Sequence, residues 1–169
     1  MKIETQYTEF VSALRDTIFR LALSIVNDSA EAEDIVQDVF EKVWRTSDKI
    51  LESSYPRAYV CRIAHNMAID RQRARVRRQT FSLNSATITH SETDANSEIA
   101  DMASITREII STLAEKQRLA IHLRDIEGYE IDEIAEVLNT DETNVRMNLS
   151  RARKTVREEL LKRLRHGVE

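Results

Sequence analysis

The scarcity of turn-forming residues is the feature that most restricts the fold of this chain. Its 169 residues include only two glycines, Gly128 and Gly167, and one proline, Pro56. Folds made of many short strands need such residues at their turns, so an all-β sandwich or barrel is nearly excluded. The two glycines also cannot form a G-x-G-x-x-G or G-x-x-x-x-G-K phosphate loop. Helices joined by short turns are the architecture that this composition favours.

Hydrophobic residues recur at three- and four-residue spacing, which predicts an all-α fold. The expected helices cover 7–26, 28–47, 56–77, 98–113, 115–127, 131–138 and 142–165. Asp28 and Asp141 are suited to cap the second and last helices, and Gly128 is suited to end the fifth. The expected buried stripe of the second helix includes Val43 and Trp44. The polar stretch 48–55 is expected to connect the second and third helices.

Residues 79–100 interrupt the helical pattern. They are rich in serine and threonine, contain acidic residues and lack helical periodicity over most of their length. Such a composition predicts a flexible acidic linker. The chain is therefore expected to form two small helical domains, 1–78 and 101–169, joined by residues 79–100.

The charges are segregated along the chain, although the net charge is only −4. Residues 21–41 hold six acidic residues and no basic one, whereas residues 71–78 hold five arginines and no acidic residue. Residues 146–165 hold eight basic residues against two acidic ones. Two basic runs favour a polyanion contacted at two places, and ordinary solvated helix faces are the alternative.

Patterns for catalysis and metal binding are absent from the sequence. None of the four histidines lies in an H-E-x-x-H or E-x-x-H pattern, and a single cysteine, Cys61, excludes an intrachain disulfide. A carboxylate metal site at Glu31, Asp34 and Asp38 is a weak alternative, because no second carboxylate stripe matches it. We expect no catalytic residue, no metal and no cofactor. Without a signal pattern or a long apolar run, a cytoplasmic protein with no membrane insertion is predicted.

The second helix carries a polar stripe opposite its buried one, and we name it the acidic stripe. It consists of Asp34, Gln37, Asp38 and Glu41, at positions i, i+3, i+4 and i+7. We expect no lysine or arginine at i+4 to neutralise it. The acidic stripe is therefore interpreted as a docking surface for a basic partner, with a solvated face as the alternative.

The third helix presents Tyr59, Arg62, Asn66 and Arg73 on one face. Rings stack on bases, amides bond to base edges and cations contact phosphates, so this combination suits single-stranded nucleic acid. The alternative is that Tyr59 and the nearby Trp44 belong to the core.

The end of the chain has the pattern of a helix-turn-helix. A short helix over 131–138 is followed by the turn 139–141 and by a long helix with a basic surface. Asn139 tolerates the left-handed conformation that such a turn needs. A plain helical hairpin is the alternative, and the basic second helix favours DNA binding.

Several stretches resemble the bacterial sigma factors. AEAEDIVQDVFEKVW (30–44) and PRAYVCRIAHNMAIDR (56–71) resemble sigma region 2. EKQRL (115–119), LRDIEG (123–128), EIAEVL (133–138) and VRMNLSRAR (145–153) resemble sigma region 4. With these two regions and a short linker, the chain resembles an extracytoplasmic-function (group 4) sigma factor.

This resemblance implies a function. A sigma factor binds core RNA polymerase, through the β′ clamp helices and the β flap, and recognises promoter DNA as duplex and as single strand. The family also implies an anti-sigma factor as a partner and an acidic linker in the RNA-exit path. A stand-alone helix-turn-helix regulator with an N-terminal helical sensor domain is the alternative.

The resemblance also implies site residues by position. For polymerase binding they are Asp34, Gln37, Asp38 and Phe40. For recognition and melting of the −10 element they are Lys42, Tyr59, Arg62 and Asn66. For the −35 element they are Arg124, Thr143, Asn144, Arg146, Met147, Ser150, Arg151 and Arg153.

Overall fold

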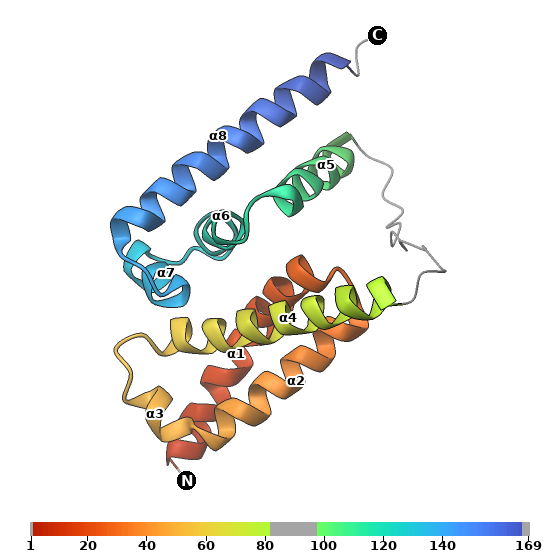
Figure 1. Cartoon of the computed structure of the whole chain (residues 1–169). Coiled ribbons are helices and arrows are strands. Elements are labelled where there is room, and N and C mark those ends of the chain that lie inside the picture. Colours follow the sequence, from red (N-terminus) through yellow and green to blue (C-terminus); the bar gives the residue numbers. More distant parts are fainter. Residues whose placement is uncertain (1, 82–97, 167–169) are drawn as a thin grey trace.

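The computed structural model of the chain describes residues 2–81 and 98–166, and every regular element in these ranges is helical (Figure 1). The first domain contains α1 (Lys2–Val26), α2 (Ser29–Arg45), α3 (Ser47–Leu51) and α4 (Pro56–Phe81). The second contains α5 (Glu98–Thr112), α6 (Glu115–Ile121), the π-helical turn η1 (His122–Ile126), α7 (Ile131–Leu138) and α8 (Glu142–His166). The prediction of an all-α fold with two helical domains is confirmed.

The core of the first domain is formed where α1, α2 and α4 pack together. Ile18 of α1, Ile35 of α2 and Ala64 of α4 are all fully buried. The entry into α2 follows its local sequence, because the Asp28 carboxylate accepts a hydrogen bond of 2.8 Å from the backbone N–H of Glu31.

The second domain packs α6 and α7 against α8, with α5 lying along the later part of α8 (Figure 1). Leu123 and Val145 are fully buried in it. The turn between α7 and α8 has Asn139 in the left-handed conformation, with a φ of 49°. Asp141 caps α8 by accepting a 2.8 Å hydrogen bond from the backbone N–H of Asn144. The predicted helix-turn-helix is therefore present.

Several sequence predictions were wrong in detail. A short helix, α3, lies inside the stretch predicted as a polar connection, since Ile50 is an isolated apolar residue that becomes fully buried. Helices α4 and α5 extend into both ends of the predicted linker, and residues 82–97 lie outside the described part of the chain. Trp44 was expected in the core, but its neighbour Val43 takes the buried position and Trp44 is 59% exposed.

The two domains contact each other. Helix α4 packs on α1 and α2 with one side and against α7 with another (Figure 1). No helix in the described ranges is long and apolar enough to cross a membrane.

Candidate nucleic-acid interface

A basic groove lies along the exposed side of α8. It has a volume of about 580 Å³, and we name it the α8 groove. It is lined by Arg124, Ile131, Arg146, Leu149, Ser150, Arg153, Lys154 and Arg157. Five of these eight side chains are cationic, so the groove is suited to the phosphates and base edges of a nucleic acid.

The α8 groove brings together four of the predicted −35 residues, namely Arg124, Arg146, Ser150 and Arg153. The other four do not line it; they are Thr143, Asn144, Met147 and Arg151. Asn144 has a local role instead, because its amide donates to the Asp141 carboxylate at 2.8 Å. Met147 is 40% exposed at the start of α8.

Lys154 and Arg157 line the groove without belonging to the set that the resemblance implies. A signal for Arg157 existed in the sequence. Residues 146, 150, 153 and 157 are spaced by four, three and four positions, so they share one face of a helix.

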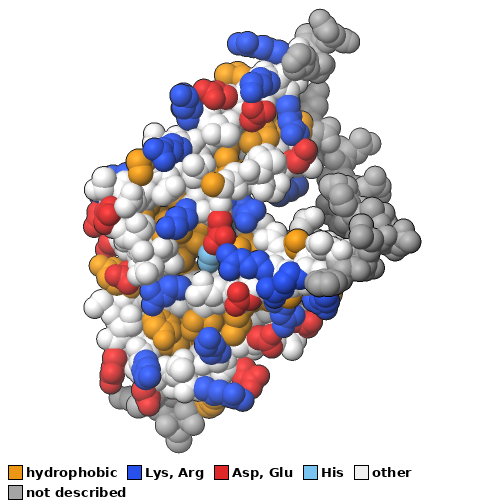
Figure 2. Space-filling model, in the orientation of Figure 1, with side chains coloured by type: hydrophobic (Ala, Val, Ile, Leu, Met, Phe, Trp, Pro, Cys, Tyr) orange, Lys and Arg blue, Asp and Glu red, His pale blue; other side chains and the backbone are white. Residues whose placement is uncertain are grey.

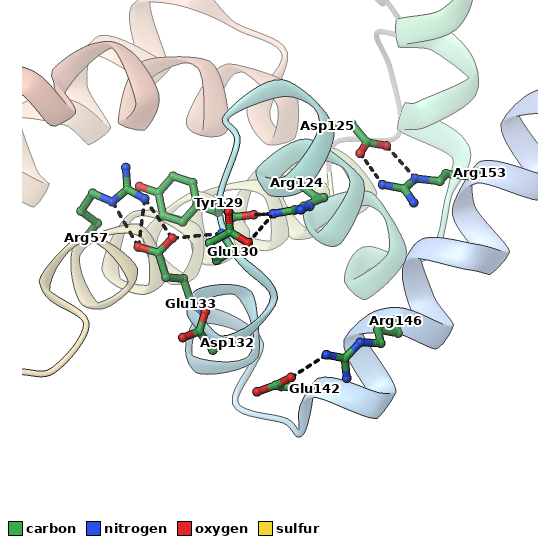
Figure 3. Close-up of polar contacts among 10 residues, drawn as sticks. All are labelled: Arg57, Arg124, Asp125, Tyr129, Glu130, Asp132, Glu133, Glu142, Arg146 and Arg153. Carbon is green, nitrogen blue, oxygen red and sulfur yellow. Dashed lines mark hydrogen bonds and ion pairs between the residues drawn. The ribbon is translucent and has the colours of Figure 1, made fainter.

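Carboxylates hold the arginines of the α8 groove in place (Figure 3). Arg146 is paired with Glu142 at 2.7 Å. Arg153 donates two hydrogen bonds to Asp125, at 2.6 and 3.0 Å, and the first of these effects raises the pKa of Arg153. DNA phosphates must therefore compete with acidic side chains of the protein for these cations.

Arg124 also has a structural role. Its guanidinium donates to the carbonyl oxygen of Tyr129 at 2.7 Å and to the Glu130 carboxylate at 2.9 Å. Between them lies Gly128, whose φ of 72° ends the preceding turn as predicted. Arg124 thus stabilises the connection from η1 to α7 as well as lining the groove.

The predicted −10 face of α4 is only partly formed by free side chains. The Arg62 guanidinium lies 5.6 Å from the centre of the Tyr59 ring, a cation–π distance. Tyr59 is half-buried, whereas Asn66 and Lys42 are exposed. Arg62 also donates a hydrogen bond of 3.2 Å to the backbone carbonyl of Glu136 in α7.

The acidic stripe is exposed along α2, but it is not unneutralised as predicted. Arg45 lies at i+4 from Glu41 and forms an ion pair with it. Arg71 of α4 bonds to Asp38 and lies 4.0 Å from Asp34. The expectation of a stripe without cationic partners was wrong because it missed Arg45 and could not foresee a partner from another helix. Phe40 is half-buried and packs on the core.

Comparison with known proteins assigns both domains. Residues 10–78 match the family described as sigma-70 region 2, and residues 104–156 match the family described as sigma-70, region 4. The two regions occur in the order expected for a sigma factor and do not favour a stand-alone regulator.

Three curated relatives agree. A probable RNA polymerase sigma factor, RfaY of Xanthomonas campestris, is 29% identical over 93% of this chain and 41% of its own length. The RNA polymerase sigma-E factor of Streptomyces avermitilis is 29% identical over 92% of this chain and 85% of its own. The extracytoplasmic-function sigma factor SigJ of Mycobacterium tuberculosis is 30% identical over 89% of this chain and 50% of its own. The chain belongs to the extracytoplasmic-function sigma factors. It therefore spans about half or less of RfaY and SigJ.

A solved structure shows the same fold. The sigma factor RpoE of Bartonella quintana, in complex with the anti-sigma factor NepR, matches this sigma factor with a TM-score of 0.73 and 22% identity. The match covers 93% of this chain and 97% of that one. Sigma factors are transcription initiation factors that direct RNA polymerase to promoters, and the α8 groove belongs to the region 4 helix-turn-helix of this one.

The first basic run of the sigma factor, residues 71–78, is partly taken up by ion pairs within the protein. Besides Arg71, Arg75 lies 3.5 Å from Glu31, and Arg73 lies 3.8 Å from Glu115. Figure 2 shows basic and acidic side chains side by side over one face of the molecule, without a continuous basic surface there. Three of the five arginines in the run therefore hold helices together, which favours the structural alternative for them.

A metal site finds no support in the geometry. Within residues 2–81 and 98–166, no three histidine, cysteine or acidic side chains lie close enough to hold an ion. Asp34 and Asp38, considered above as carboxylate ligands, contact Arg71 instead.

Proposed function

We propose that this sigma factor divides promoter recognition between two surfaces and docks on polymerase with a third. The α8 groove reads the −35 element, the Tyr59–Asn66 face of α4 holds the opened −10 element, and the acidic stripe binds the polymerase clamp. The domains for these tasks are residues 1–78 and 101–169, with 79–100 as the linker. The observation that carries the proposal is the clustering of five cations in one groove of a helix-turn-helix.

Within the α8 groove, position along the helix separates two roles. Arg146 lies in the second turn after the Asp141 cap, and the first turns of a recognition helix enter the major groove. An arginine there can bond to a guanine through two hydrogen bonds. Lys154 and Arg157 lie further along and are assigned to phosphates, which fix register but carry no sequence information.

The acidic stripe offers carboxylates that are exposed and held in place. The side chains of Asp34 and Asp38 are 68% and 49% exposed, and Arg71 restrains both from α4. A basic polymerase helix would exchange with Arg71 for these carboxylates, so Arg71 is expected to compete with polymerase.

The other features of the proposal follow from the family. The sigma factor catalyses no covalent step and uses the free energy of binding to open DNA. It acts in the cytoplasm, where polymerase and promoters are. An anti-sigma factor is a further partner, since the similar solved structures of RpoE and CnrH contain NepR and the cytosolic domain of CnrY.

Run-off transcription with core polymerase tests the proposal as a whole. We expect the full chain to direct initiation at a small set of library promoters that share sequences near −35 and −10. Binding to specific duplex DNA without polymerase, and no new start sites with it, would instead support a stand-alone regulator.

A pair of variants tests the docking surface. Asp34→Asn with Asp38→Asn should reduce capture of core polymerase, because the attracting charges are lost. Arg71→Gln breaks the same ion pairs but leaves the acidic residues available, so it should keep or increase capture. If both variants lose capture equally, packing of α2 on α4 rather than charge explains the effect, and the docking assignment fails.

A further inference from the structure

One stripe of α4 faces the second domain. Its residues are Arg57, Cys61 and His65, each four positions apart. Arg57 donates to the Glu133 carboxylate at 2.9 Å, and its guanidinium lies 4.4 Å from the centre of the Tyr129 ring (Figure 3). The Cys61 sulfur lies 3.1 Å from the Tyr129 hydroxyl, and both side chains are buried. This stripe is thus a contact surface between the domains.

A second contact joins α1 to the end of η1. Arg20 donates to the two carboxylate oxygens of Glu127 at 2.7 and 2.8 Å, and the Thr17 hydroxyl donates at 2.9 Å. The Glu127 side chain is only 3% exposed, and His122 Nε2 lies 3.5 Å from it. A buried carboxylate is costly unless it is fully partnered, so these partners make the domain contact specific.

The charges across the contact are complementary. The first domain supplies the cations Arg20, Arg57 and Arg62, and the second supplies the acceptors Glu127, Glu133 and the Glu136 carbonyl. Opposite charges on two surfaces fix the register in which they dock and disfavour other arrangements. The contact therefore has one defined geometry.

The contact overlaps the proposed −10 face. Arg62 bonds to α7 through the Glu136 carbonyl and lies over the Tyr59 ring, so α7 engages a group proposed to bind DNA. The names of the two promoter elements place them about 25 base pairs apart, or roughly 85 Å along B-form DNA. Domains that touch through α4 and α7 cannot occupy both elements at once.

We propose that this contact is an autoinhibitory clasp that keeps the free sigma factor closed. The clasp is formed by Arg20, Arg57 and Cys61 on one domain and by Glu127, Tyr129 and Glu133 on the other. It withholds part of the −10 face from DNA until docking on polymerase separates the domains. The statement about DNA rests on the proposed function of α4, whereas the clasp itself does not.

The test compares two double variants with the same change of charge. Arg20→Glu with Arg57→Glu opposes the two clasp carboxylates with negative charge. Arg15→Glu with Arg163→Glu is the control, because these arginines pair with Glu33 and Glu108 inside their own domains. None of the four arginines belongs to the proposed DNA or polymerase surfaces. Circular dichroism and thermal melting establish that both variants are folded.

The thiol of Cys61, the only cysteine of the chain, reports opening. It is fully buried, and burial raises its pKa to about 12, so alkylation by iodoacetamide should be slow in the closed protein. Intact mass spectrometry should show alkylation at least tenfold faster in the clasp variant and unchanged in the control. Adding core polymerase to the natural sequence should accelerate alkylation as well.

Binding of a single-stranded oligonucleotide tests the inhibition. Its sequence is the non-template −10 strand of a promoter mapped by run-off transcription. The free clasp variant should bind it at least fivefold more tightly than the control variant, although both carry the same added negative charge.

Three results would overturn the clasp. Slow alkylation of a folded clasp variant would mean that these ion pairs do not hold the domains together. Fast alkylation without tighter binding of the oligonucleotide would mean that the contact is not inhibitory. Slower alkylation on polymerase would mean that docking does not open it. Loss of run-off activity in every variant would refute the proposed function instead, and alkylation would still report on the clasp.

Discussion

Asp125 is expected to weaken the binding of promoter DNA, so Asp125→Asn should bind it more tightly. In the structure the Asp125 carboxylate accepts two hydrogen bonds from Arg153, at 2.6 and 3.0 Å. Both side chains are partly exposed, at 36% and 49%. A phosphate that binds Arg153 must displace this carboxylate or remain close to it.

The size of the effect has two contributions. Breaking a solvent-exposed ion pair costs about 0.2–1 kcal/mol. A phosphate held by Arg153 would lie about 6 Å from the Asp125 carboxylate, and the repulsion at that distance is about 0.7 kcal/mol in water. Removing the charge of Asp125 should therefore improve binding by about 1–1.5 kcal/mol at low salt, which is roughly five- to tenfold. Salt screens both contributions, so the gain should shrink as the ionic strength rises.

Fluorescence anisotropy of a labelled promoter fragment with reconstituted holoenzyme, at two salt concentrations, measures the gain. Glu108→Gln is the matched control, because Glu108 also accepts two hydrogen bonds from an arginine, Arg163, but lies outside the α8 groove. The control should bind like the natural sequence. Equal or weaker binding by Asp125→Asn at both salt concentrations would refute the competition between Asp125 and DNA.

Three further predictions concern the readers, the opened strand and pH. Arg146→Ala should cost about 1–3 kcal/mol and relax the preference at one or two promoter positions, whereas Lys154→Ala should weaken all promoters and lower the salt slope by about one; promoter libraries transcribed at two salt concentrations separate these outcomes. Tyr59→Ala and Asn66→Ala should impair open-complex formation by about 1–3 kcal/mol per unstacked base, and failure of a pre-melted bubble template to rescue either variant would contradict this role. Burial alone would raise the pKa of Glu127, but hydrogen bonds from Arg20, His122 and Thr17 lower it from 4.5 to about 2. Its ionised form thus stabilises the folded protein above about pH 4.5 and progressively less as the pH falls toward 2, so the difference in melting temperature from Glu127→Gln should shrink over that range.

Local features of the fold followed from the sequence. Helix periodicity depends on residues three and four positions apart, and a cap depends on a side chain within three residues of the backbone that it binds. Asp28, Asn139 and Asp141 therefore act as expected. The helix α3 was missed because a single buried residue, Ile50, stabilises it against the rest of the domain.

The candidate site was only partly open to prediction. The face shared by Arg146, Ser150 and Arg153 follows from helical spacing alone, and the groove contains all three. The bonds of Arg124 to the η1–α7 connection depend on the chain reversing at Gly128, so spacing along a helix did not indicate them.

The sequence by itself determined the helices, the recognition helix with its basic face and the resemblance to sigma regions 2 and 4, because each depends on residues close together in the chain. The tertiary structure decided which charges are neutralised and where the domains touch. Arg71 reaches Asp38 across 33 positions, and Arg20 reaches Glu127 across 107. Such pairs leave no periodic signal in the sequence, since they form only when packing of the apolar cores brings distant helix faces together.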